Sequence, residues 1–202
     1  KAYGLNYGNK SDRPHYTREG LMKLCTPEQV QADRLNMISI LENWKKRQDS
    51  AKPLLVLLNT SGGGHRSATF TLSMLQQLDS LTQGTIMKKI FLISGASGGM
   101  IGATYFRELY LQRLKGKPIN LQHTKYVEDI AGDVLNPVFS SFVARDLIAP
   151  AQKFKVNEYT YVKDRGYAFE EKLNMNTRGL LNKQIGDYAA DEKEAKIPLM
   201  FY

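Results

Sequence analysis

The 202-residue chain has 28 Lys and Arg against 20 Asp and Glu, a formal net charge of +8 at pH 7, and 42% hydrophobic residues, enough for one packed domain or a large part of one. A single cysteine excludes an internal disulfide, no apolar run reaches the roughly 18 residues of a membrane span, and no signal-peptide pattern opens the chain. The positive charge indicates either attraction to anionic lipid headgroups or an ordinary solvated surface, and no nucleic-acid-binding motif accompanies it.

The chain begins with a polar stretch and then a predicted helix. Residues 1–26 are rich in Tyr, Gly and charged side chains without periodicity, which predicts an irregular arm. Thr26 is a suitable N-cap and Pro27 a suitable first helical residue, so we expect a helix from Pro27 to about Gln48. Its apolar side should contain Val30, Leu35, Ile38, Leu41 and Trp44. Trp44, with basic residues after it, is either a membrane-interface anchor or a packed core residue, and packing is the favoured interpretation.

Three apolar segments predict strands: Leu54–Asn59, Lys89–Ser94 and Ile197–Tyr202. An amphipathic stretch at 67–81 predicts a crossover helix between the first two strands, and residues 100–114 predict a helix after the second. A strand–helix–strand unit makes the two strands parallel, so the loops that follow them should meet at one edge of the sheet.

The loop after the first strand contains three consecutive glycines, Gly62, Gly63 and Gly64. Such a run lets several backbone N–H groups point at one spot, assisted by the positive end of the following helix. In an acyl-transfer enzyme this arrangement binds the oxyanion of the tetrahedral intermediate. Arg66 has the planar donor geometry that suits a phosphate, or it forms a salt bridge with a loop carboxylate, and His65 is a weaker candidate for a general base.

The loop after the second strand matches the pattern G-x-S-x-G with Gly95, Ser97 and Gly99. This pattern places a serine on a sharp strand-to-helix turn, where its hydroxyl is exposed. Ser97 is therefore the candidate nucleophile, and the N–H of Gly98 is a further oxyanion donor.

Together, the strand-S-G-G-G-H-R-helix and strand-S-G-A-S-G-G-helix segments resemble the patatin-like phospholipase family and its relatives, the cytosolic phospholipases and lysophospholipases. The resemblance is clear from Leu54 to about Lys115. It implies a three-layer α/β/α hydrolase fold with a mostly parallel central sheet. It also implies a lipid-ester substrate, a Ser–Asp dyad without a cofactor, and a substrate-phosphate contact by Arg66.

The family's aspartate lies in an Asp-Gly motif, and no Asp-Gly pair occurs in this sequence. With only three strands, we expect residues 27–202 to be the N-terminal part of such a domain, with the acid beyond Tyr202. Residues 120–165 alternate apolar bursts with helix breakers, which predicts either a lid or acyl-pocket insertion or ordinary core helices.

Two alternatives to this function stay open. One is an α/β-hydrolase with a triad whose histidine lies beyond Tyr202. The other is a non-catalytic module that binds anionic lipid or phosphate through the glycine loop. The three histidines, His15, His65 and His123, are too isolated for a metal site. We expect a cytoplasmic or membrane-associated protein in peripheral contact with anionic membranes.

Overall fold

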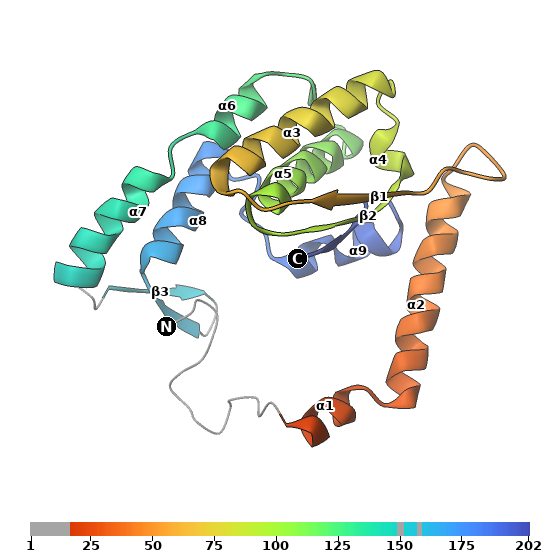
Figure 1. The fold of residues 1–202 in the computed structure, drawn as a ribbon, viewed down its shortest axis with the longest axis horizontal. Helices are drawn as coiled ribbons and strands as arrows, with labels where there is room; N and C mark the ends of the chain where they lie inside the picture. Colours follow the sequence, from red (N-terminus) through yellow and green to blue (C-terminus); the bar gives the residue numbers. More distant parts are fainter. Residues whose placement is uncertain (1–16, 149–151, 157–158) are drawn as a thin grey trace. The chain divides into compact units, whose positions relative to one another are not determined.

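The computed structural model describes residues 17–148, 152–156 and 159–202 (Figure 1). The described chain is a mixed α/β protein that divides into two compact units. One unit, here called the sheet unit, comprises residues 36–132 and 174–202. The other, here called the hairpin unit, comprises the described parts of 1–35 and 133–173.

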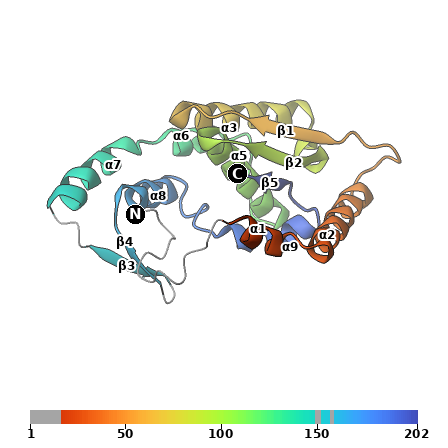
Figure 2. The same ribbon diagram turned by 60° about the horizontal axis from the view of Figure 1, so that its bottom comes forward.

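The sheet unit is built on three parallel strands in the order β1-β2-β5 (Figure 2). Their bounds are β1 Val56–Thr60, β2 Ile90–Gly95 and β5 Leu199–Phe201. Thr60 at the end of β1 pairs with Gly95 at the end of β2, and Leu92 pairs with Leu199. The predicted strands and their parallel direction are confirmed, so the loops after β1 and β2 leave the same edge of the sheet.

Two long helices position these loops. α3 (Gly64–Leu81) begins at the last residue of the triple glycine, and α5 (Ser97–Leu114) begins at the candidate serine. The helices pack along each other so closely that a Cβ on Gly102 would lie 2.1 Å from the carbonyl oxygen of Ala68. α5 buries side chains on every side, among them Tyr105, Phe106 and Leu109, because it lies inside the unit.

Shorter elements complete the sheet unit: α4 Ile86–Lys89, α6 Lys125–Ala131, the 3₁₀-helix η3 Ile185–Tyr188, and α9 Ala189–Lys193. Tyr126 and Ile130 of α6 are buried, at 3% and 0% exposure. This part of the stretch 120–165 is therefore core, as one of the two interpretations predicted.

The hairpin unit contains α1 (Arg18–Leu24), α7 (Leu135–Ser141), the π-helical η2 (Phe142–Ile148) and the antiparallel hairpin of β3 (Lys153–Val156) and β4 (Tyr159–Val162). α8 (Arg165–Asn176) begins in this unit. Large apolar side chains of α7 and η2 are exposed, including Leu135, Phe139, Leu147 and Ile148. A lid function for this segment stays a prediction.

The arm at 1–26 is not irregular throughout, because Arg18–Leu24 forms α1. The Oγ1 atom of Thr17 accepts a hydrogen bond of 3.0 Å from the N–H of Gly20, which caps the helix. The sequence analysis overlooked this short helix, since seven residues are too few for a clear apolar period. Residues 1–16 of the predicted arm lie outside the described residues.

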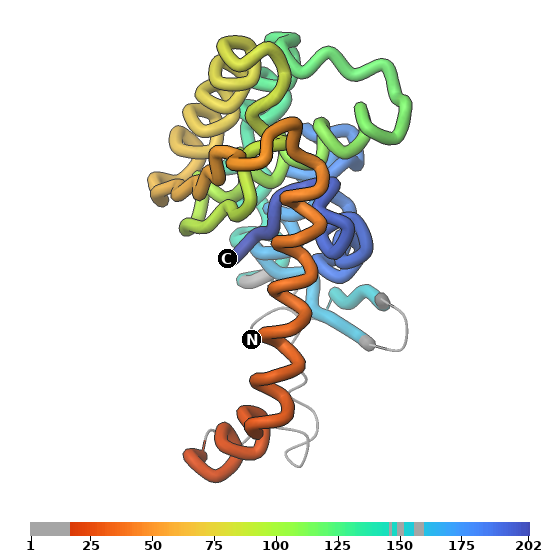
Figure 3. Tube along the Cα trace, turned by 90° about the vertical axis from the view of Figure 1, so that its right-hand side faces the viewer, coloured from red at the N-terminus to blue at the C-terminus, as the bar shows by residue number. Residues whose placement is uncertain are grey.

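The predicted helix after Pro27 is α2 (Pro27–Lys46), a continuous helix that Figure 3 shows in red to orange. Trp44 is buried, donates from Nε1 to the carbonyl oxygen of Lys88 at 3.1 Å, and packs edge-on against Phe91. Packing, not membrane anchoring, is thus confirmed for this side chain. The predicted apolar side of α2 is wrong as a buried face, because four of its residues are 39–56% exposed: Val30, Leu35, Ile38 and Leu41. Among the described residues, no helix is both long and apolar enough to cross a membrane.

Candidate active site

The triple-glycine loop and Ser97 lie side by side. They follow neighbouring parallel strands whose last residues, Thr60 and Gly95, are paired. A Cβ built on Gly62 would lie 3.4 Å from the Cβ of Ser97. The topology therefore brings a row of glycine N–H groups next to a serine hydroxyl.

Ser97 has an unusual backbone conformation. Its φ is +52°, in the left-handed region that non-glycine residues rarely adopt, and its side chain is exposed. A conformation of this kind costs about 1–3 kcal/mol and persists only where the surroundings impose it, which is frequent at functional sites. Here the strain turns the chain sharply from β2 into α5 and leaves the serine at the tip of the turn.

The glycines around Ser97 are required by close backbone contacts. A Cβ on Gly95 would lie 2.1 Å from the carbonyl oxygen of Thr60, and a Cβ on Gly98 would lie 1.8 Å from that of Gly64. Neither contact can be relieved by rotating a side chain, because both involve main-chain oxygens. The G-x-S-x-G turn can reach the glycine loop this closely only without these two side chains.

Both helices start without a side-chain cap. The N-cap of α3 is Gly63 and that of α5 is Ala96, and neither makes a capping hydrogen bond. Alanine is a poor N-cap, with a cost of roughly 0.5–2 kcal/mol relative to Ser or Asp. Within the described part of the chain, the N–H groups of Gly62 and Gly63 also have no hydrogen-bond partner. Two helix N-termini thus leave donors open to an anion at one place.

Arg66 and His65 follow the glycines in the first turn of α3. Arg66 is exposed, and among the described residues it forms neither an ion pair nor a hydrogen bond, so its guanidinium can meet an anionic group. His65 is half-buried, and its Nε2 atom is buried without a partner in the described chain. No hydrogen bond between described residues connects His65 with Ser97.

No acid for Ser97 is found among the described residues, since no carboxylate there accepts a hydrogen bond from its hydroxyl. Asp164 is a carboxylate that could be considered as the acid of the dyad, but its side chain has a different role. Its Oδ1 accepts a 3.0 Å hydrogen bond from the N–H of Tyr167 and so caps the start of α8.

One side chain at the glycine loop was missed by the sequence analysis. Ser67, in the first turn of α3, donates from Oγ to the carbonyl oxygen of Ser61 at 2.6 Å. The sequence did show a hydroxyl residue three positions after Gly64. Serine is common near the start of a helix, however, so its presence there did not predict a contact with the loop.

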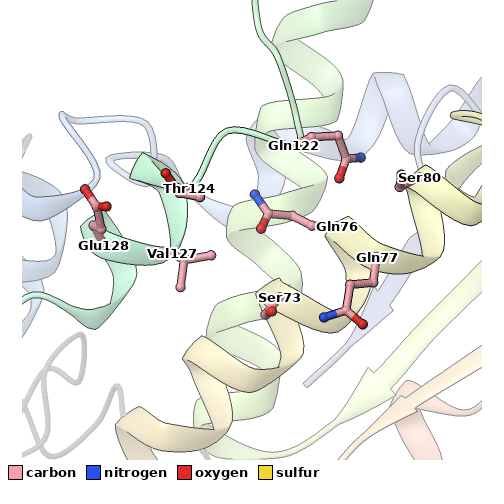
Figure 4. Close-up of a pocket in the computed structure, with 8 residues that line it drawn as sticks. All are labelled: Ser73, Gln76, Gln77, Ser80, Gln122, Thr124, Val127 and Glu128. Atoms are coloured by element: carbon pink, nitrogen blue, oxygen red, sulfur yellow. The ribbon is translucent and has the colours of Figure 1, made fainter.

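A separate pocket of about 490 Å³ lies between the middle of α3 and α6 (Figure 4). Its lining includes Gln76 and Gln77 from α3 and Gln122, Thr124 and Glu128 from the segment after α5. Gln76 donates to the carbonyl oxygens of Leu121 and His123, which ties this segment to α3. None of the site residues predicted from the sequence lines this pocket.

Among residues 17–148, 152–156 and 159–202, no three His, Cys, Asp or Glu side chains gather in a way that could hold a metal ion. Comparison of the chain with models of protein families, with curated proteins and with solved structures finds no match.

Proposed function

We propose that this chain carries the nucleophile and oxyanion hole of a serine acyl hydrolase that cleaves lipid esters, in the manner of the patatin-like phospholipases. The observation that carries the proposal is Ser97 at φ +52°, at the uncapped start of α5 and beside the unpartnered N–H groups of the glycine loop. A strained, exposed serine next to open backbone donors is the arrangement that acyl transfer requires.

In the proposed reaction, the Ser97 oxygen attacks the ester carbonyl carbon, and the negative charge on the carbonyl oxygen is received by the N–H groups of Gly62, Gly63, Gly64 and Gly98. The serine proton passes to an aspartate and then to the leaving alcohol as the ester C–O bond breaks. Water then hydrolyses the acyl–serine ester, which releases a fatty acid and restores Ser97. Among the described residues no carboxylate contacts Ser97, and the sequence contains no Asp-Gly pair, so the structure identifies no residue as the aspartate of the proposed dyad.

Three features support a lipid ester as the substrate. The two motifs resemble those of the phospholipase family, and the net charge of +8 favours anionic lipid surfaces. The guanidinium of Arg66, which has no partner among the described residues, suits a headgroup phosphate. The exposed apolar side chains of α7 and η2 are also compatible with contact to acyl chains.

The test is labelling by a fluorophosphonate probe, which reacts with activated serines, followed by peptide mapping. We expect the complete gene product to be labelled at Ser97 and to hydrolyse phospholipid vesicles. Ser97→Ala should remove both activities while the thermal unfolding temperature changes little. Ser80→Ala, at an exposed serine of α3, is the matched control and should retain both.

Hydrolysis retained in the Ser97→Ala variant would refute the assignment of the nucleophile. No labelling, together with salt-sensitive binding to anionic vesicles, would indicate the non-catalytic lipid-binding module instead. A histidine in the complete gene product whose substitution abolishes hydrolysis would indicate the triad hydrolase.

A further inference from the structure

In the part of the chain that the structure describes, one side chain forms a hydrogen bond with the glycine loop of the proposed oxyanion hole. The Ser67 hydroxyl donates to the Ser61 carbonyl oxygen at 2.6 Å, from the first turn of α3 back across the loop. The same oxygen is packed against α5, since a Cβ on Gly99 would lie 2.4 Å from it. The Ser61 carbonyl is therefore held in a slot between α3 and α5.

The direction of this carbonyl fixes the direction of the next N–H group. In a planar trans peptide unit, the C=O of one residue and the N–H of the following residue point in opposite directions. Since the Ser61 oxygen points toward Ser67 and Gly99, the Gly62 N–H points away from the slot. That N–H has no partner among the described residues, and Gly62 is the loop residue whose added Cβ would lie 3.4 Å from the Ser97 Cβ.

A glycine-rich loop needs such a tether. Glycine populates positive and negative φ about equally, so a peptide unit beside it can rotate at low cost in the absence of other restraints. Gly63 has φ +150° and Gly64 has φ +61°, which shows how far this loop departs from ordinary conformations. A rotated Ser61–Gly62 peptide unit would present a carbonyl oxygen to the substrate in place of a donor, and a developing oxyanion would then be repelled.

We infer that Ser67 is a positioning residue, whose hydroxyl holds the Ser61 carbonyl and thereby keeps the Gly62 N–H aimed as an oxyanion donor. This inference rests on the proposed acyl hydrolase function. It adds a residue that contacts neither substrate nor nucleophile but determines whether one donor is available.

The test compares four forms of the complete gene product: wild type, Ser67→Ala, Ser67→Thr and Ser67→Val. Thr keeps the hydroxyl, and Val has nearly the same shape without it. With a soluble aryl ester as substrate, we expect kcat to fall about 10- to 100-fold in the Ala and Val variants. This loss is no larger than the roughly 100- to 1,000-fold loss that follows complete removal of one oxyanion donor. KM and the unfolding temperature should stay near wild type, and Thr should restore most of kcat.

A second readout separates positioning from a structural role. Affinity for an aryl boronic acid, which forms a tetrahedral adduct with the serine, should fall by the same factor as kcat/KM in the Ala and Val variants. An active wild type with unchanged kcat in Ser67→Val overturns this inference alone. A loss that appears only in KM, or that follows the unfolding temperature, also overturns it. A wild type that neither hydrolyses esters nor reacts with the probe overturns both this inference and the proposed function.

Discussion

The two halves of α5 are held in place by different kinds of contact. In the N-terminal half, Gly98, Gly99 and Gly102 let the backbone approach main-chain oxygens of the glycine loop and the start of α3, and the only side-chain hydrogen bond among the described residues of that loop is the Ser67 tether. In the C-terminal half, the buried Arg107 and Glu108 form ion pairs with Glu192 and Lys183, respectively. Arg107 also donates to the carbonyl oxygen of Pro198 at 2.9 Å, next to β5.

The difference separates open backbone donors from buried ion pairs along one helix. Among the described residues, the contacts at the N-terminal half leave the N–H groups of Gly62 and Gly63 without partners, whereas the buried charges of the C-terminal half are paired with the residues before β5. The Arg107 guanidinium also stacks 4.4 Å from the ring centroid of Tyr188, and burial together with Glu108 raises the pKa of that tyrosine. Substitutions in the two halves should therefore have different consequences.

The largest expected effect is a loss of stability, from a substitution among the buried charges of α5. Arg107→Met removes one partner of a buried ion pair and leaves Glu192 without its cation, so we expect a loss of about 3–5 kcal/mol in the free energy of unfolding. Urea titration measures it. Fluorophosphonate labelling of Ser97 in the fraction that remains folded should keep its wild-type rate.

Lys115→Met is the matched control, because Lys115 also joins α5 to α9, through a 2.9 Å ion pair with Asp191. The Lys115 side chain is 51% exposed, and such pairs contribute at most about 1 kcal/mol. Equal losses in the two variants would show that burial of Arg107 has no special importance.

The next effect is on the proposed esterase activity, from a substitution in the first turn of α5. Gly98→Ala forces a Cβ to within 1.8 Å of the Gly64 carbonyl oxygen, so the serine turn and the glycine loop must separate. We expect kcat/KM to fall about 100-fold, equivalent to about 2.7 kcal/mol of transition-state free energy. The stability loss should be smaller than for Arg107→Met, roughly 1–3 kcal/mol.

Gly186→Ala in η3 provides the control, since a Cβ at this position would meet no atom within 4 Å and the φ of Gly186 is not positive. It should leave ester hydrolysis and stability near wild type. If Gly98→Ala is as active as this control, the close approach of the two loops is unimportant for catalysis.

The smallest effect concerns the pH dependence of stability and a carboxyl group in the last turn of α3. Asp79 is 2% exposed, and burial raises the pKa of its carboxyl above the ordinary value of 3.8, against the opposing effects of Arg113 and Gln122. The unfolded chain then ionises first, so this group destabilises the fold progressively as pH rises above 3.8. Asp79→Asn should remove that dependence, which urea titrations of both proteins from about pH 3.5 to about pH 7 would reveal.

Asp133, in the hairpin unit, should affect the pH dependence of stability in the opposite direction. The N–H groups of Asn136 and Leu135 lower the pKa of its carboxyl, so its stabilising contribution is present above the ordinary value of 3.8 and is lost as pH falls below it. Asp133→Asn should therefore weaken the fold at neutral pH and have less effect in acid. Identical pH dependences for the two variants would contradict both assignments.

Local sequence patterns were sufficient to predict the strands β1 and β2 and the helices α3 and α5. They also predicted that Ser97 lies close to the glycine loop. An apolar run followed by small residues limits the backbone to a strand and a tight turn, and parallel strands bring their following loops to one edge. The same reasoning failed for the apolar side of α2, because periodicity identifies an apolar stripe but not the surface that covers it.

The sequence by itself thus determined where the chain turns and which glycines and serine stand in those turns, since these depend on glycine conformation and on neighbours along the chain. Only the tertiary structure decided the φ of Ser97, the contact of Ser67 with Ser61 and the pairing of Arg107 with Glu192. These features depend on atoms brought together by the packing of α3, α5 and the C-terminal segment, and in the case of Arg107 the partners are 85 residues apart.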